Sequence, residues 1–172
     1  MERNYNRSTM NHIADVHCGV RLDTGVVTCL ARMTSASHNP FNIFGRVRIN
    51  HLFIEAITIW GAQAGTVLFN HDAIDPATAV KPLSGACASV VGQLAEGLRI
   101  VFVGGAVATA AVITATAGIS DVICESPHVV GTKGGYGYVG YQNTGAAVTS
   151  GTMQVTICYA PMDEGSYMTA NW

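Results

Sequence analysis

The stretch NPFNIFGRVRINHLFIEAITIW (residues 39–60) carries the clearest fold signal in this 172-residue chain. It opens with the turn signal Asn39-Pro40, and after it Val47 and Ile49 alternate with polar neighbours. Alternation with a period of two is typical of a strand that has one solvated face. The first part of the stretch therefore predicts a strand at the surface of a sheet.

From residue 52 onward the pattern changes, because apolar side chains occupy both faces of the predicted strand. One face carries Leu52, Ile54 and Ala56, and the other carries Phe53, Ile57 and Ile59. A strand that is apolar on both faces is covered on both sides, and in an antiparallel protein the second cover is often another subunit. We expect residues 39–60 to form the central strand pair of a β-sandwich protomer within an oligomer.

The remainder of the chain repeats this pattern of short apolar runs separated by turn residues. Further strands are predicted at residues 26–33, 66–70, 98–103, 106–116, 121–125, 152–160 and 166–170, with a loop or edge strand at 71–82. No amphipathic helix longer than two turns is expected. The sequence predicts an all-β, jelly-roll-like antiparallel β-sandwich, in which residues 1–22 form an extended N-terminal arm and residues 23–172 a single domain.

Composition points to a surface that faces other protein. Charged residues make up 12% of the chain, about half of the roughly 25% typical of soluble domains. A poorly charged monomer is the alternative. The net charge of −2 does not favour nucleic acid as a partner.

The cysteines and the longest uncharged run bear on the cellular compartment. Five cysteines form no CxxC pair, so buried reduced thiols and assembly in a reducing cytoplasm are expected. The N-terminus has no apolar core of a secretory signal. Residues 100–119 are uncharged and long enough to span a bilayer, but their Gly, Thr and Val content favours strands, and no membrane association is expected.

Motifs for catalysis are missing from the sequence. GYGYVG (residues 135–140) has the spacing GxGxxG, yet no helix follows that could meet a phosphate. A glycine-rich hairpin or loop is expected instead. The six histidines show no HExxH or HxH spacing, and His71 and Asp72, with Asp75 close by, are expected to form a solvated loop pair rather than a metal site. No GxSxG is present, so we predict no enzyme, no cofactor and no metal.

Glu55, within the central stretch, is flanked by apolar residues on both sides, Ile54 and Ala56. A buried lone carboxylate is costly unless it is paired. We expect a structural ion pair, for which Arg46, Arg48 and Arg99 are the candidate partners.

The order of these segments resembles the small virion proteins that decorate or cement the capsids of tailed bacteriophages. An aromatic-led strand runs through Gly into a β-rich stretch ending in Leu-x-x-Glu-x-x-Thr, and the matching residues are Phe44, Gly45, Val47, Ile49, Leu52, Glu55 and Thr58. Glu96-Gly97 and residues 98–105 match a later β run into Gly-Gly. The final strand and its Tyr-x-Pro match Gly151, Met153, Val155, Ile157, Tyr159 and Pro161.

The resemblance implies a jelly-roll-like protomer, commonly trimeric, that sits on a capsid without enzymatic activity. The expected partners are further copies of the chain and a major capsid protein, and the expected location is the capsid surface after assembly in the host cytoplasm. The interface residues that we predict are Leu52, Ile54, Glu55, Arg46, Arg48, Tyr136 and Tyr138.

Two alternatives remain open from the sequence. One is a head-fibre or tail-knob protein that binds host glycan through Tyr136, Tyr138, Tyr141 and Trp172. The other, from a different class, is a small β-barrel ligand-binding protein or enzyme, which predicts a pocket with convergent polar groups.

Overall fold

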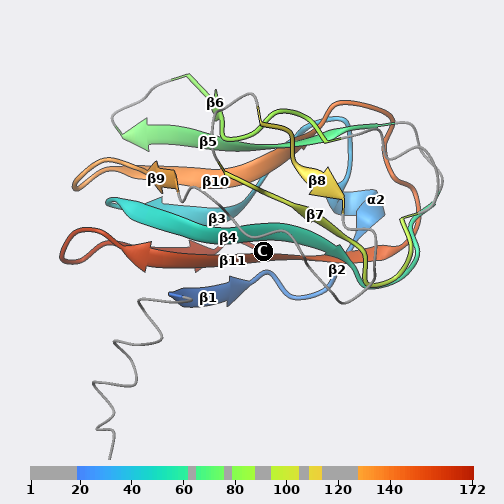
Figure 1. Ribbon diagram of the computed structural model, residues 1–172, viewed down its shortest axis with the longest axis horizontal. Helices are drawn as coiled ribbons and strands as arrows, with labels where there is room; N and C mark the ends of the chain where they lie inside the picture. The colour runs from blue at the N-terminus through green and yellow to red at the C-terminus, as the bar shows by residue number, and fades with distance from the viewer. Residues whose placement is uncertain (1–18, 62–64, 76–78, 88–93, 105–108, 114–127) are drawn as a thin grey trace, which may run out of the picture.

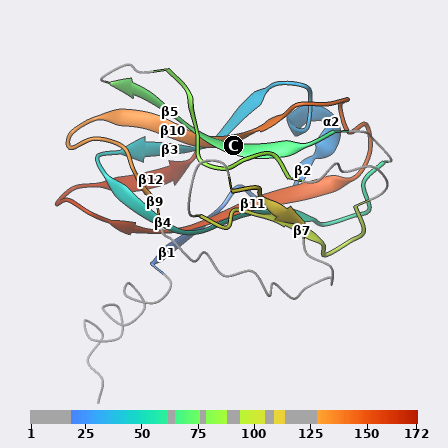
Figure 2. The same ribbon diagram turned by 45° about the horizontal axis from the view of Figure 1, so that its top comes forward.

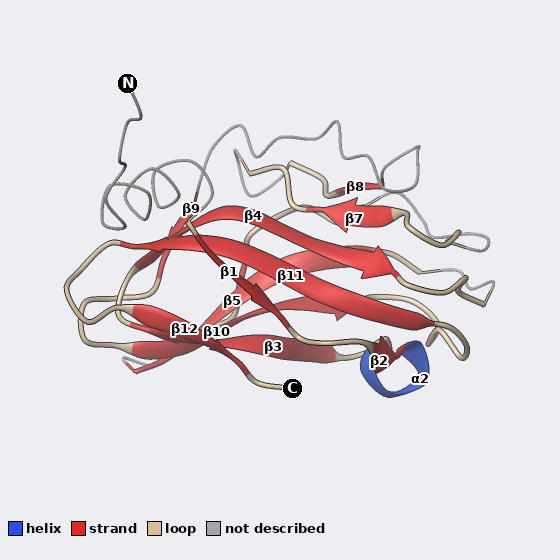
Figure 3. Ribbon diagram, turned by 90° about the horizontal axis from the view of Figure 1, so that it is seen from below, coloured by secondary structure: helices blue, strands red, loops and turns tan. Residues whose placement is uncertain are grey.

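A computed structural model describes residues 19–61, 65–75, 79–87, 94–104, 109–113 and 128–172. It confirms the prediction of an all-β sandwich, because two antiparallel sheets pack face to face over one core (Figures 1 and 2). Within these ranges helix is limited to one turn, α2 (Cys29–Arg32), at one end of the sandwich (Figure 3).

Sheet A has seven strands. Its main path runs β1 (Val20–Asp23), β11 (Thr152–Pro161), β4 (Val47–Ala56), β7 (Arg99–Val101) and β8 (Val112–Ile113). In addition, β2 (Val27–Thr28) pairs with β11, and β9 (His128–Val130) pairs with β4. The two ten-residue strands β4 and β11 form its centre.

Sheet B has five strands. They follow the order β12 (Tyr167–Ala170), β3 (Ser37–Phe44), β10 (Tyr136–Asn143), β5 (Val67–Asp75) and β6 (Lys81–Pro82). The chain passes from one sheet to the other between β3, β4 and β5, and again between β10, β11 and β12. Such repeated crossing is typical of jelly rolls.

This topology corrects the expected central strand pair. β3 belongs to sheet B and β4 to sheet A, so the two strands within residues 39–60 do not pair with each other. Gly45, at φ +75°, makes the turn between the sheets. Asn39-Pro40 is no turn either, because it lies inside β3 where the pairing with β10 shifts register, and a proline is tolerated at such a bulge.

A β-bulge in β4 explains the change of pattern at residue 52. His51 pairs with Cys158 and Ile49 with Tyr159, which leaves Asn50 as the extra residue. One extra residue reverses the alternation, so Leu52 and Ile54 continue the inward face begun by Ile49. Leu52 and Ile54 are therefore buried at 1% and 0% exposure in the protomer's own core, and their prediction as interface residues was wrong.

The core fills the space between the two sheets. Its largest fully buried side chains are Trp60, Tyr141, Phe41, Phe69 and Phe102. The hydroxyl of Tyr141 donates a hydrogen bond to the carbonyl of Arg32. Tyr141 is therefore a core residue, and its expected exposure as a glycan contact was wrong.

Other local predictions met mixed outcomes. The strands expected at residues 152–160 and 166–170 are confirmed as β11 and β12. Residues 26–33 do not form one strand, because the chain leaves β2 for α2, and the Cys29 amide donates to the Gly151 carbonyl 3.0 Å away. β5 extends to Asp75, beyond the predicted end at residue 70.

Residues 20–22, predicted as part of the arm, instead pair with β11 as part of β1. Residues 1–18 and 121–125 lie outside the described residues. Within residues 100–119 the structure places the end of β7 and all of β8. Across the described segments, no helix is both long and apolar enough to cross a bilayer.

Candidate functional site

The remaining predicted interface residues fall on two separate surfaces. On sheet A, the Glu55 carboxylate accepts a hydrogen bond from Arg99 Nε at 3.0 Å, with both side chains 22% exposed. The predicted ion pair is confirmed with Arg99 as partner. Arg48 instead donates to Asn50 Oδ1, and Arg46 binds Asp163. Tyr136 and Tyr138 lie on the outer face of sheet B.

The outer face of sheet B carries two parallel rows of side chains that cross the strands. In the first, which we name the aromatic row, Tyr167, Phe44 and Tyr136 are direct cross-strand neighbours. The second, the polar row, contains Thr169, Asn42, Tyr138 and Asp72 in the same register. The aromatic row thus places one side chain on each of β12, β3 and β10, and the polar row adds one on β5, at the interstrand spacing of about 4.8 Å.

The rings of the aromatic row touch one another. Phe44 stacks on Tyr167 with ring centroids 4.6 Å apart and an interplanar angle of 18°. Its centroid lies 5.0 Å from that of Tyr136, which in turn meets Tyr138 edge-on at 5.3 Å. Such contacts stabilise aromatic side chains against one another. Tyr167 is nevertheless 46% exposed, so the row presents aromatic surface to solvent.

Hydrogen bonds tie the two rows together. The Tyr136 hydroxyl donates to Asn42 Oδ1 at 3.2 Å, and Asn42 Nδ2 donates to the Thr169 hydroxyl at 3.1 Å. A hydrogen bond with Tyr138, together with desolvation, raises the pKa of Tyr136 to about 12. The hydroxyl of Tyr136 therefore keeps its proton at neutral pH, and the positions of the polar groups are set before any ligand arrives.

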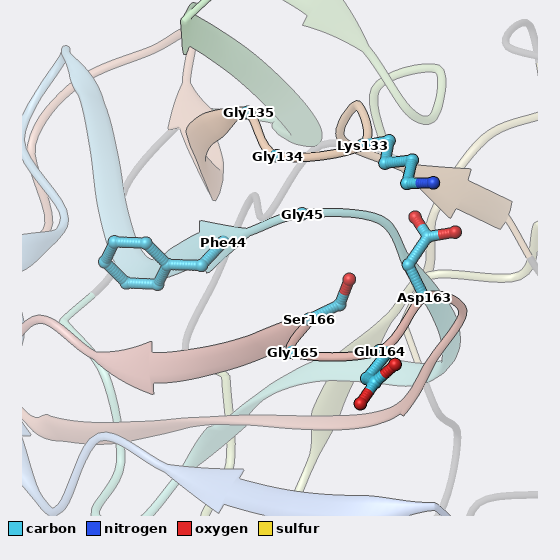
Figure 4. Close-up of a pocket in the computed structure, with 9 residues that line it drawn as sticks. All are labelled: Phe44, Gly45, Lys133, Gly134, Gly135, Asp163, Glu164, Gly165 and Ser166. Atoms are coloured by element: carbon cyan, nitrogen blue, oxygen red, sulfur yellow. The ribbon is translucent and has the colours of Figure 1, made fainter.

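A cavity of about 290 Å³ adjoins the end of the aromatic row (Figure 4). Three turns form its wall, and its lining residues are Phe44, Gly45, Lys133, Gly134, Gly135, Asp163, Glu164, Gly165 and Ser166. Figure 4 shows Phe44 on one side of the cavity and Lys133 with Asp163 on the other. Gly135 and Ser166 immediately precede Tyr136 and Tyr167 in the chain, which makes the cavity continuous with the aromatic row.

The charges around this cavity define what we name the charged end of the sandwich, namely Arg46, Lys133, Asp163 and Glu164. Arg46 contacts Asp163 through two hydrogen bonds of 2.8 and 2.6 Å. This bidentate contact lowers the pKa of the Asp163 carboxyl, and the charge of Lys133 lowers it further. Both partners stay ionised at neutral pH, in contact with water.

The opposite end is poor in charge: Arg32 closes α2 there, and Glu96 lies in the turn whose residues 94 and 97 hydrogen-bond to Trp60 and Ala56. Three segments meet there, residues 24–31, 57–61 and 144–152, and none contains Asp, Glu, Lys or Arg. Thr152 links the second and third of these segments, because its carbonyl accepts hydrogen bonds from the Ile57 amide and from Trp60 Nε1, the latter at 3.2 Å. We name this surface the neutral end. Val26, Leu30 and Ile59 project from it with exposures of 58%, 61% and 52%.

A second cavity, of about 310 Å³, opens at the edge between the sheets, where β5 and β6 face β9. His71, Lys81 and His128 lie in its wall. Burial lowers the pKa of His71, and its Nε2 atom is buried without a hydrogen-bond partner. Among the described residues no cluster of three or more His, Cys, Asp or Glu is arranged to hold a metal ion.

Two further sequence predictions can be placed. The glycine-rich segment at residues 135–140 is mostly strand β10, and the next element in the chain is β11, so the described residues offer no helix for a phosphate loop. Its glycines allow close approach, since a Cβ on Gly140 would lie 2.1 Å from the His38 carbonyl oxygen. Cys29 and Cys87 are buried free thiols as expected, and burial raises the pKa of Cys29 to about 12.

Sequence reasoning missed most of the aromatic face. Phe44 entered only through the family resemblance, Asp72 only as a neighbour of His71, and Tyr167, Asn42 and Thr169 were not selected. A signal was present: each aromatic residue of the row lies within two positions of a turn glycine with positive φ, namely Gly45, Gly134 or Gly165. What could not be derived locally is that these three turns stand side by side at one end of the sandwich.

Comparison with family models, with curated proteins and with solved structures finds no match to this chain. The assignment of function therefore depends on the chemistry of the surfaces described above.

Proposed function

We propose that this protein is a structural component of a virus particle that binds and stabilises a tailed-phage capsid as a decoration or cement protein, and that it does so as a trimer. The neutral end is the observation that carries the proposal. A soluble monomer rarely gathers half-exposed Val, Leu and Ile side chains on a surface so poor in charge. Contact with a second protein surface explains their exposure.

The energetics fit a contact repeated many times. Complete burial of a large aliphatic side chain contributes about 1.5–3 kcal/mol, so covering the exposed halves of three side chains contributes roughly 3 kcal/mol per protomer. One such contact is weak. A closed ring of copies on a lattice engages many of them at once, and avidity then makes the whole assembly stable.

One feature of the sheet edge supports association through the end of the sandwich. On the edge strand β12, the Met168 amide donates to the Tyr159 hydroxyl at 3.1 Å. This internal partner occupies a backbone donor that a foreign strand could otherwise use. Association by strand addition at this edge is thereby disfavoured, whereas the neutral end has no comparable protection.

The oligomer is tested by charging the neutral end. We expect the wild-type chain to elute as a trimer in gel filtration with light scattering, and the double variant Leu30→Glu, Ile59→Glu to elute as a monomer. The matched control is Val129→Glu, Met162→Glu, which adds the same charge at positions of 53% and 47% exposure outside the neutral end. A wild-type chain that stays monomeric at micromolar concentration contradicts the trimer.

The virion assignment needs a separate measurement. We expect mass spectrometry of purified particles to detect the chain in stoichiometric amounts, and a density map at low resolution to place it on the shell. Density on an appendage, or absence of the chain from particles, contradicts the capsid assignment whatever the oligomeric state. No nucleic acid and no catalytic group has a part in the proposed function.

A further inference from the structure

We infer that the outer face of sheet B, together with the cavity beside it, is a binding site for neutral carbohydrate. The site would take an uncharged hexose chain along the aromatic row, with its hydroxyl groups over the polar row. This activity goes beyond the proposed shell function, since it uses the opposite part of the molecule from the neutral end.

The arrangement of the two rows matches the two kinds of surface on a sugar. A pyranose ring exposes C–H groups on its flat faces and hydroxyl groups around its rim. The C–H groups carry slight positive charge and pack against the negative faces of aromatic rings. A row of three aromatic side chains beside a parallel row of hydrogen-bonding groups therefore provides partners for both surfaces.

Tyr167 is the principal stacking residue of the proposed site. It is the most exposed ring of the aromatic row, at 46%, and Phe44 supports it from one side at 4.6 Å. A ring held in place by its neighbour loses little conformational entropy on binding. The remaining exposed surface of Tyr167 and the adjoining ring edges supply the apolar contact.

The polar row provides donors and acceptors in fixed positions. The Thr169 hydroxyl accepts a hydrogen bond from Asn42 at 3.1 Å, so its own proton is available to a ligand. The Asp72 carboxylate, next to Tyr138 across the strands, is an acceptor for sugar hydroxyls. Small-molecule sites commonly combine apolar area with a few such oriented polar groups.

Charge on this face selects neutral ligands. Among the described residues, the charged ones in register with the two rows are Asp72 and Asp75, which pair with Tyr138 and Tyr136. Both are acidic, so a sulfated or uronic-acid polymer, or a nucleic acid, would meet repulsion. The same argument favours uncharged sugars, whose hydroxyl groups donate readily to carboxylates.

The adjoining cavity would hold the terminal unit of a bound oligosaccharide. At about 290 Å³ it lies at the lower limit of the volumes that hold small ligands, roughly 300 Å³. Lys133 and Glu164 in its wall offer a donor and an acceptor on the side of the cavity away from the Phe44 ring. A terminal sugar unit placed there would be held by hydrogen bonds, while the preceding units lie along the aromatic row.

The experiment uses the full-length chain and defined probes. A glycan array that holds neutral and acidic glycans is screened first. Isothermal titration with cellohexaose, maltohexaose and mannohexaose follows, with a hyaluronan hexasaccharide as the acidic control. We expect binding to at least one neutral oligosaccharide and no binding to the acidic one.

Variants then locate the site. Tyr167→Ala should weaken binding about tenfold or more, and Tyr138→Phe, which removes only a hydroxyl group, should weaken it several-fold. Tyr167 is exposed, so its replacement should leave the unfolding midpoint close to that of the wild type. Val129→Ala, at an exposed position on β9 of sheet A outside both surfaces, is the matched control and should bind the oligosaccharide as the wild type does.

The remaining outcomes overturn the inference. They are absence of binding on the array and in all titrations, preference for the acidic probe, or unchanged affinity in Tyr167→Ala. If Tyr167→Ala instead dissociates the oligomer, the aromatic face is a protein interface and not a carbohydrate site. Failure of carbohydrate binding leaves the light-scattering test of the neutral end unaffected, so the two proposals can be judged separately.

Discussion

The two ends of the sandwich differ in how many charged side chains they expose. At the charged end, the turns carry Arg46, Lys133, Asp163 and Glu164, and an ion pair bridges two of the turns. At the neutral end, three segments without charge leave Val26, Leu30 and Ile59 exposed. β4 runs between the two ends, from Val47, paired with Pro161, to Ala56, paired with Met153.

The pKa shifts at the two ends have opposite causes. At the charged end, hydrogen bonds from Arg46 lower the pKa of Asp163 because they favour the charged carboxylate. Toward the neutral end, burial lowers the pKa of His38 because it disfavours the charged imidazolium. One end thus concentrates charged side chains in contact with water, whereas the other carries few. A surface poor in charge costs little to desolvate when another protein covers it.

The largest expected effect comes from the anchor of the neutral end. Trp60 is 1% exposed, and its indole N–H donates to the Thr152 carbonyl at 3.2 Å. Trp60→Ala should lower the free energy of unfolding by about 3–5 kcal/mol, measured by guanidinium denaturation. Its exposed neighbour offers the control, since Ile59→Ala should change stability by only about 0.5 kcal/mol. Equal effects of both variants would show that this end is loosely packed.

Matched glycines at the two ends provide the second test. Gly131 (φ +84°) and Gly25 (φ +74°) have similar backbone conformations, but a Cβ would lie 2.1 Å from the Gly45 carbonyl oxygen at residue 131 and meet nothing within 4 Å at residue 25. Gly25→Ala should cost about 1–2 kcal/mol from conformation alone. Gly131→Ala should cost about 1–3 kcal/mol more from overlap. Similar unfolding midpoints for the two variants would refute the close packing of the charged-end turns.

A smaller effect is expected from pH toward the neutral end. The pKa of His38 is lowered from 6.5 by burial and by Arg32, against a hydrogen bond with Thr34. The imidazole of His38 therefore binds its proton more tightly in the unfolded chain than in the folded protein. The contribution of His38 to the free energy of unfolding is constant above pH 6.5. It falls as the pH drops toward the lowered pKa of folded His38, and it is constant again below that pKa. Denaturant midpoints measured across this range check the expectation.

The variant His38→Gln should flatten part of that decline. His71, whose pKa is lowered mainly by burial, should account for a further part. If His38→Gln shows the same dependence as the wild type, His38 does not contribute to it.

The smallest effect is expected at the ion pair of the charged end. Asp163→Asn should leave the unfolding midpoint at neutral pH unchanged within error, because exposed ion pairs contribute little. The lowered pKa of Asp163 means that any contribution is present above pH 3.8 and is lost as the pH falls through the folded-state pKa. An NMR titration should find the pKa of the Asp163 carboxyl below 3.8 in the wild type and closer to 3.8 in Arg46→Gln. A pronounced loss of stability in Asp163→Asn would show that this end is as desolvated as the other.

Particular residues show which structural features the local sequence pattern predicts and which it does not. The alternation in residues 152–160 predicted β11 because a regular half-buried strand leaves its period in the sequence. The change of phase at Asn50 was visible too, but an inserted bulge and a second covered face produce the same apolar pattern. Only the pairing of Ile49 and His51 with neighbouring residues of β11 distinguishes them.

The candidate sites divide in the same way. The pairing of Glu55 with a nearby arginine followed from the cost of burying a lone carboxylate, yet the choice of Arg99 over Arg46 and Arg48 depended on β7 lying next to β4. Tyr136 and Tyr138 were selected from sequence, whereas their partners Phe44 and Tyr167 come from strands far away in the chain. Cross-strand neighbours are set by register, which local sequence does not encode.

The amino-acid sequence by itself determined that this chain forms an antiparallel sandwich with little charge, because strand periodicity, turn residues and composition are local properties. The tertiary structure alone decided that the uncharged segments meet at one end and that four aromatic rings meet on one face. Both surfaces are assembled from residues distant in sequence, since the chain passes between the sheets and neighbouring strands come from remote segments.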